Sequence, residues 1–228
     1  MRVIESEKAR TAIKIAVPAI LTGAALACAF FASDGRKYVV ITVICALLAL
    51  LLFAAGFDRR RIGSRRLVLG AVFAALAVAG RFIPLLKPLT ALVIISGVYT
   101  GAETGFLVGA TAVLVSNVWF GNGPWTPMQM VSLGLIGFFA GILSPLLKKG
   151  LAPMLIYGAV SGVFYSMFMD IWTVASATGS VSLAEYGDAL YHAAPFTVSY
   201  ALANVLYLFL LAPPFGRKLQ RIADKYGL

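Results

Sequence analysis

A small set of polar and aromatic side chains lies inside or beside strongly apolar segments, and these side chains are the candidates for chemistry. Ionisable and amide groups in such segments are costly to bury, so they usually face a cavity or a partner. A pocket for a small molecule combines apolar walls with a few placed polar groups. We predict one such pocket near the outer ends of several helices; its candidate residues are Arg81, Asn117, Gln129, Asp170, Trp172, Tyr200 and, slightly deeper, Asn204.

The alternative for this set is purely structural. Arg81 could extend toward the headgroups and pair with Asp170, which would hold the helices together without any ligand. Because several helices contribute polar groups at one depth, we favour the pocket.

The stretch SNVWFGNGPWTPMQM (116–130) separates two apolar runs and contains no charge. Thr126, Pro127 and Gln129 stand at the N-cap, N1 and N3 positions of the next helix, which predicts a capping box with Gln in place of Glu. Gly121 and Gly123 would allow the positive φ of a tight reversal. Trp119 and Trp125 suit the headgroup region, and we include both as candidate ligand-binding residues.

Motifs of catalysis are missing. The sequence has no phosphate-binding glycine loop, no Ser–His–Asp arrangement and no HExxH motif, and Asp170 is the only acid deep in an apolar segment. Cys28 and Cys45 lie in apolar segments with no partner at a metal-ligand spacing. We predict no catalytic residue, no metal and no cofactor. Two alternatives stay open: an enzyme acting on lipid-linked substrates through Arg81, Asp170 and His192, and an assembly subunit without a ligand.

The composition indicates what positions these residues. Of 228 residues, 61% are hydrophobic and 12% charged, with a mean hydropathy of +0.91. A soluble domain carries about 25% charged residues, and a spanning helix needs roughly 20 mostly apolar ones. The chain is therefore predicted to be an all-α integral membrane protein. Its apolar segments are 12–32, 39–57, 67–84, 89–101, 104–118, 128–147, 151–175 and 195–212.

The basic residues indicate the orientation. If 58–66 (DRRRIGSRR) is cytoplasmic and the spans alternate from there, most Lys and Arg are cytoplasmic, as the positive-inside rule requires; the others are Arg36, Lys37, Arg81 and Lys87. This predicts a multi-pass protein of the cell membrane with both termini in the cytoplasm. The net charge of +10 then reflects lipid headgroups and topology, not nucleic acid. The connection 176–194 would be extracellular.

The segment 67–84 carries small residues at helical spacing. Ala71, Ala75 and Ala79 recur every four residues, and Gly70 and Ala74 form a second row beside them. Such rows let two helices approach closely in a membrane. By themselves they favour packing inside the same bundle.

The stretch 116–130, followed by GLIGFFAG and preceded by ISGVYTGAETGFLVGATAVLVSN, resembles the substrate-binding S component of energy-coupling factor (ECF) vitamin transporters. RRLVLGAVFAALAVAGRF fits the same pattern, and the resemblance covers residues 64–222. It is strongest to the subset associated with cobalamin and related corrinoids.

This resemblance implies a six-helix bundle that binds a vitamin-like solute at its extracellular side. It also implies a transmembrane coupling subunit and two ATPases as partners, with Ala71, Ala75 and Ala79 docking on the coupling subunit and Asn117, Trp125 and Gln129 bordering the ligand. The expected domains are a hairpin with a basic linker (1–63), which is extra to the family pattern, and the bundle (64–228). A pterin, a deazapurine or a smaller vitamin is the alternative ligand.

Overall fold

The computed structural model describes residues 6–31, 37–56, 63–84 and 86–226. Within these residues the chain forms nine helices and no strand, which confirms the all-α prediction. The helices are α1 (Glu7–Phe31), α2 (Lys37–Gly56), α3 (Gly63–Gly80), α4 (Leu89–Thr100), α5 (Ala102–Phe120), α6 (Thr126–Ile142), α7 (Ser144–Leu147), α8 (Leu151–Thr178) and α9 (Leu183–Tyr226). Each predicted apolar segment is largely helical, although 128–147 contains two helices, α3 ends before residue 84, and residues 32 and 57 lie outside the described part of the chain.

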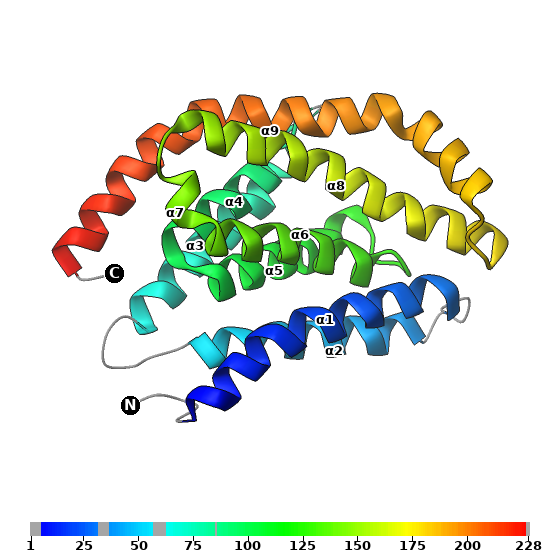
Figure 1. The fold of residues 1–228 in the computed structure, drawn as a ribbon, viewed down its shortest axis with the longest axis horizontal. Helices are drawn as coiled ribbons and strands as arrows, with labels where there is room; N and C mark the ends of the chain where they lie inside the picture. The colour runs from blue at the N-terminus through cyan, green and yellow to red at the C-terminus, as the bar shows by residue number, and fades with distance from the viewer. Residues whose placement is uncertain (1–5, 32–36, 57–62, 85, 227–228) are drawn as a thin grey trace.

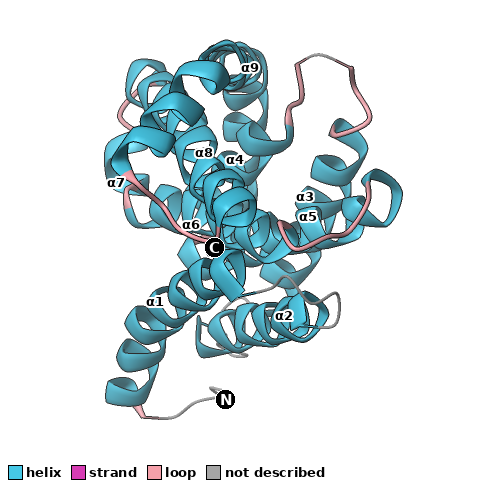
Figure 2. Cartoon of the chain, turned by 90° about the vertical axis from the view of Figure 1, so that its right-hand side faces the viewer, coloured by secondary structure: helices cyan, strands magenta, loops and turns pink. Residues whose placement is uncertain are grey.

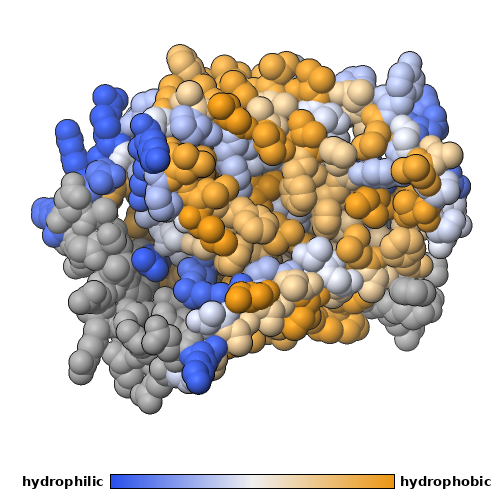
Figure 3. All heavy atoms as spheres, in the orientation of Figure 1, coloured by the Kyte–Doolittle hydropathy of each residue, from blue (hydrophilic) through white to orange (hydrophobic). Residues whose placement is uncertain are grey.

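Three helices are long and apolar enough to cross a membrane: Ala102–Phe120, Leu151–Thr178 and Leu183–Ile222. On the face shown in Figure 3, hydrophobic side chains cover the middle of the molecule, and hydrophilic ones gather at the two ends of its long axis. The helices run mostly along that axis (Figure 1). On this face the hydrophobic side chains thus lie along the middle of the helices, where a bilayer would contact them.

Helix α4 is the centre of the bundle. It packs on α3, α5, α6, α8 and α9, and most of its residues are buried. Gly101 joins α4 directly to α5 with a φ of 104°, a value that favours glycine because other residues are strained there.

Glycines bring the backbones of α5 and α6 into contact. A Cβ placed on Gly105 would lie 2.3 Å from the carbonyl oxygen of Gly137, and a Cβ on Gly109 would lie 2.4 Å from that of Leu133. No side chain fits at these positions. Close packing through small residues is how helices associate in lipid, and here glycines provide it inside the bundle.

The N-terminal hairpin covers one side of the bundle. Helix α2 packs on α5 and α6, and α1 packs on α6 and α8, whereas α9 lies on the opposite side of the bundle, against α8 and α4 (Figures 1 and 2). Lys14 of α1 and Glu103 of α5 form an ion pair with 2.5 Å between Nζ and Oε1. The Glu103 side chain is largely buried, so this pair joins the hairpin to the core by charge as well as by apolar contact.

The connection predicted over 176–194 is much shorter, because residues 183–194 are helical and begin α9. Ser182 and Glu185 form a reciprocal capping box: Ser182 N donates to Glu185 Oε2 at 3.1 Å and Glu185 N to Ser182 Oγ at 3.2 Å. The basic tail continues the same helix up to Tyr226. The predicted segment 128–147 is in turn divided at Leu143 into α6 and α7.

Candidate functional site

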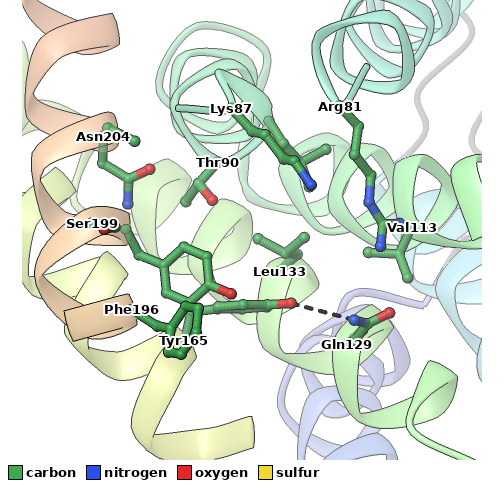
Figure 4. A pocket seen from close by; sticks show the side chains of 13 residues that line it. Arg81, Lys87, Thr90, Val113, Gln129, Leu133, Tyr165, Phe196, Ser199 and Asn204 are labelled. Atoms are coloured by element: carbon green, nitrogen blue, oxygen red, sulfur yellow. Dashed lines mark hydrogen bonds between the residues drawn. The ribbon is translucent and has the colours of Figure 1, made fainter. Parts of the chain in front are cut away.

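A cavity of about 460 Å³ opens near the end of the bundle where α3 ends and α4 begins. Its walls come from α4, α5, α6, α8, α9 and the segment between α3 and α4. Figure 4 shows Arg81 and Lys87 on one side of the cavity and Ser199 and Asn204 of α9 on the other. The lining residues are Arg81, Lys87, Leu89, Thr90, Val113, Gln129, Leu133, Tyr165, Phe196, Ser199, Tyr200, Ala203 and Asn204.

Arg81 follows the last turn of α3 and points to the end of α5. Its Nη1 donates to Ser116 Oγ at 2.6 Å and to Asn117 Oδ1 at 2.5 Å. The structure describes no ion pair between Arg81 and Asp170, so the pairing that the structural alternative required does not form. Arg81 is instead held by neutral acceptors, and its charge is not neutralised by them.

Asn117 joins Arg81 to the start of α6. The Asn117 side chain is 0% exposed; its Nδ2 donates to Thr126 Oγ1 at 3.2 Å and to Gln129 Oε1 at 3.0 Å. Gln129 Nε2 lies 3.4 Å from the hydroxyl of Tyr165. Together with the hydrogen bond from Arg81, these bonds connect the segment after α3 to α5, α6 and α8.

The capping box predicted at Thr126 is wrong. Thr126 is already the first residue of α6, the side chain of Gln129 is bound to Asn117, and no side chain caps this helix. The Thr126 hydroxyl accepts from Gly123 N at 3.0 Å, which folds the loop back on the helix. The side chains of Thr126 and Gln129 therefore form hydrogen bonds in the network around Asn117 and do not cap α6.

The two loop glycines differ. Gly121 has a φ of 95°, as predicted, but Gly123 is not among the glycines of positive φ. A Cβ on Gly123 would lie 2.4 Å from the indole ring of Trp125, so this glycine is required by close packing. Trp125 in turn contacts Trp172 edge to face, with 5.7 Å between ring centroids.

Of the predicted ligand-binding residues, Arg81, Gln129, Tyr200 and Asn204 line the cavity. Asn117 supports it from behind. The others do not line it: Trp125 and Trp172 pack on each other, and Trp119 is 64% exposed and meets Phe82 at 5.9 Å. Asp170 Oδ2 and Trp172 Nε1 are buried and have no hydrogen-bond partner among the described residues.

Several lining residues were missed by the sequence reasoning. Tyr165 lies in the middle of a continuously apolar segment, and only its hydroxyl distinguishes it there. Phe196 lies one turn before the predicted Tyr200, so a helical wheel drawn from Tyr200 would have found it. Ser199 is next to Tyr200 in the chain and has no such periodic signal. Lys87 and Thr90 carried no signal beyond their position at the start of α4.

The residues of the alternative enzymatic reading are not brought together. Arg81 lines the cavity described above, and His192 lies in a separate surface depression with Tyr191. His192 is exposed and faces Asp188 at 3.6 Å on the same helix, while Asp170 lines neither site. No group of three His, Cys, Asp or Glu residues within the described part of the chain could hold a metal ion.

The two small-residue rows of α3 differ in burial, although both border the same groove. Gly70 is buried, and a Cβ there would be 3.1 Å from Thr104 of α5. Ala71, Ala75 and Ala79 are exposed instead, so this row does not pack inside the bundle. Together with Gly70, Ala74 and side chains of α2 and α5, they line an apolar groove of about 860 Å³, which we call the alanine groove.

Over the residues that the structure describes, the chain is an all-helical protein with three helices long and apolar enough to cross a membrane and a polar cavity near the end of the bundle. No protein-family model, curated protein or solved structure was found to match this chain.

Proposed function

We propose that this chain is the solute-binding membrane subunit of an importer of the energy-coupling factor type. Helices α3–α9 make the binding bundle and supply six membrane spans, with α6 and α7 counted as one span, while α1 and α2 form the additional hairpin. Both termini are cytoplasmic, and the cavity opens to the outside. The observation that carries the proposal is the cavity itself, which combines apolar walls with polar groups from five elements.

Two features of the fold support this arrangement. The N-terminal end of α1 and the C-terminal end of α9 lie at the same end of the bundle (Figure 1), which agrees with an even number of spans. Gln129, which lines the cavity, is near the start of α6, and the loop before α6 lies away from the two termini in Figure 1. A solute would therefore enter from the side away from the termini.

The size of the cavity bears on the ligand. Pockets for small ligands measure about 300–1,000 Å³, and the cavity of about 460 Å³ is in the lower part of that range. A complete corrinoid would place only part of its structure inside. We therefore favour a smaller vitamin or a pterin-sized solute over cobalamin, which was the first expectation from the sequence resemblance.

The alanine groove supports the partner side of the proposal. Ala71, Ala75 and Ala79 are on the outward face of α3, where another helix could approach closely. The partner we propose is the transmembrane coupling subunit, which acts with two ATPases because this chain has no nucleotide-binding motif of its own. The surrounding bilayer is the other partner.

A ligand screen tests the proposal. The purified full chain in detergent is heated with each member of a vitamin panel that includes cobalamin, cobinamide, folate, biotin, nicotinate and pyridoxal phosphate. A ligand at 100 times its Kd adds about 2.7 kcal/mol to the free energy of unfolding, which a melting curve resolves. At least one ligand should raise the midpoint.

A variant that fills the cavity supplies the control. Ser199→Leu places a larger side chain in the cavity and should remove the ligand-induced shift while leaving the ligand-free midpoint near that of the native chain. Ser176→Leu makes the same change at an exposed position of α8 outside the cavity and should keep the shift. If no ligand shifts the midpoint, or if Ser199→Leu keeps the full shift, the proposal is wrong.

A further inference from the structure

We infer that the cavity selects an anionic solute, with Arg81 and Lys87 as the pair of cations that binds its carboxylate or phosphate group. This inference rests on the proposed function, because it names the chemical class of the ligand for the same cavity. It depends on the placement of the two cations, on what neutralises them and on the rest of the cavity wall.

The two cations both contact one aromatic ring, that of Phe120. Arg81 Cζ lies 4.9 Å from the centroid of the Phe120 ring, and Lys87 Nζ lies 5.3 Å from the same centroid. Both side chains are on the same side of the cavity in Figure 4. An anion on this side of the cavity would therefore be attracted by both positive charges.

No acid among the described residues neutralises this pair. The described ion pairs join Lys14 to Glu103 and Asp188 to His192, and neither Arg81 nor Lys87 takes part in one. None of the 13 residues around the cavity is an aspartate or glutamate. The cavity therefore has a net positive charge from these two side chains.

Arg81 has donors left for a ligand. A guanidinium carries five N–H donors, and the described hydrogen bonds of Arg81 use only Nη1. The bonds to Ser116 and Asn117 fix the orientation of the side chain in the absence of any ligand. A fixed guanidinium is well suited to carboxylate or phosphate, whose geometry it matches with two parallel hydrogen bonds.

The remainder of the wall is neutral and partly aromatic. Tyr165 and Tyr200 meet edge to face at 5.3 Å, and Phe196 lies one turn before Tyr200 on α9. Thr90, Gln129, Ser199 and Asn204 add neutral hydrogen-bonding groups. The wall thus offers apolar contact for the body of the solute, while the charge is recognised on the side of Arg81 and Lys87.

Matched pairs of solutes test the inference. The full chain in lipid-free detergent is titrated with nicotinate and nicotinamide, biotin and biotinamide, and pyridoxal phosphate and pyridoxal, each pair differing in the anionic group. Cobalamin and thiamine are included as ligands of other charge. Loss of a charge-assisted hydrogen bond lowers affinity roughly ten- to a hundredfold, so the neutral member of the binding pair should bind at least about tenfold more weakly.

Variants assign the effect to the two cations. Lys87 is exposed, so Lys87→Gln should leave the fold intact. It should lower the affinity for the anionic solute about tenfold and leave the affinity for its neutral relative unchanged. Arg81→Lys keeps the charge but loses the paired donors, and it should weaken the same solute. Lys149→Gln, an exposed lysine far from the cavity, should change neither affinity.

The outcomes separate the inference from the proposed function. If a neutral or cationic member of the panel binds and its anionic relative does not bind more tightly, the solute-binding function stands and the anionic class is wrong. If no compound binds, both fail together. A lipid headgroup is the other source of a phosphate: nanodiscs with phosphatidylglycerol and with phosphatidylcholine are compared, and stabilisation by the anionic lipid alone, lost in Lys87→Gln, would overturn the solute assignment.

Discussion

The amide nitrogen of Asn117 donates to Oε1 of Gln129 at 3.0 Å, which ties the last turn of α5 to the first turn of α6. The oxygen of the same amide accepts from Arg81, 36 residues earlier in the chain. The buried Asn117 side chain therefore positions two residues that line the cavity, Gln129 in its wall and Arg81 on its cationic side.

Replacing Asn117 by Ala should destabilise the protein. The change removes one hydrogen bond each from Arg81, Thr126 and Gln129, and a typical intramolecular hydrogen bond contributes about 0.5–1.5 kcal/mol. Thermal unfolding in detergent measures the effect. Gln220→Ala removes an exposed amide from α9 and should leave the midpoint unchanged; equal midpoints for both variants would contradict the role given to Asn117.

Replacing Gly137 by Ala should also destabilise the protein, because the new methyl group would lie 2.3 Å from the carbonyl oxygen of Gly105. Overpacking of this kind costs about 1–3 kcal/mol. Gly187→Ala supplies a control of opposite sign, since nothing lies within 4 Å of that position in α9. There alanine should stabilise the helix by about 0.5–1 kcal/mol. A neutral Gly137→Ala would show that α5 and α6 can separate at no cost.

The ion pair of Lys14 and Glu103 predicts an asymmetry between single variants. Lys14→Met leaves the buried Glu103 carboxylate without its partner and should lower stability by roughly 1–3 kcal/mol, less than for a fully buried pair because Lys14 is partly exposed. Glu103→Gln should cost less, and the double variant should recover part of the loss. Thermal unfolding midpoints of the native chain, the two single variants and the double variant measure this effect. A double variant less stable than Lys14→Met would show that loss of the ion pair is not the cause of the destabilisation.

The alanine groove predicts a separation of binding from transport. Ala75→Leu fills the groove on the outer face of α3, so it should reduce ATP-dependent uptake in cells about tenfold or more, while purified protein still binds its ligand with unchanged affinity. Val72→Leu enlarges an exposed residue of the same helix outside the groove and should leave uptake unchanged. Normal uptake by Ala75→Leu would remove the groove from the transport mechanism.

The helices were predictable because hydropathy and helical period are local properties of the chain. Even where a boundary was wrong, a local signal existed: Ser182 and Glu185 have the spacing of a capping box, which would have moved the start of α9 into the supposed loop. Pro195 obscured it, because proline usually marks a helix end, although helices packed in a membrane protein tolerate it.

The sequence by itself determined that the chain is helical and rich in segments of membrane character, and that polar groups gather near the helix ends. Only the tertiary structure decided which of these groups meet. Arg81 faces Asn117 and not Asp170, and Trp119 turns outward while Tyr165 lines the cavity. The reason is physical: a helix specifies which residues share its own faces, but the face that meets a neighbour depends on close packing, here on glycines that bring α5 and α6 into backbone contact.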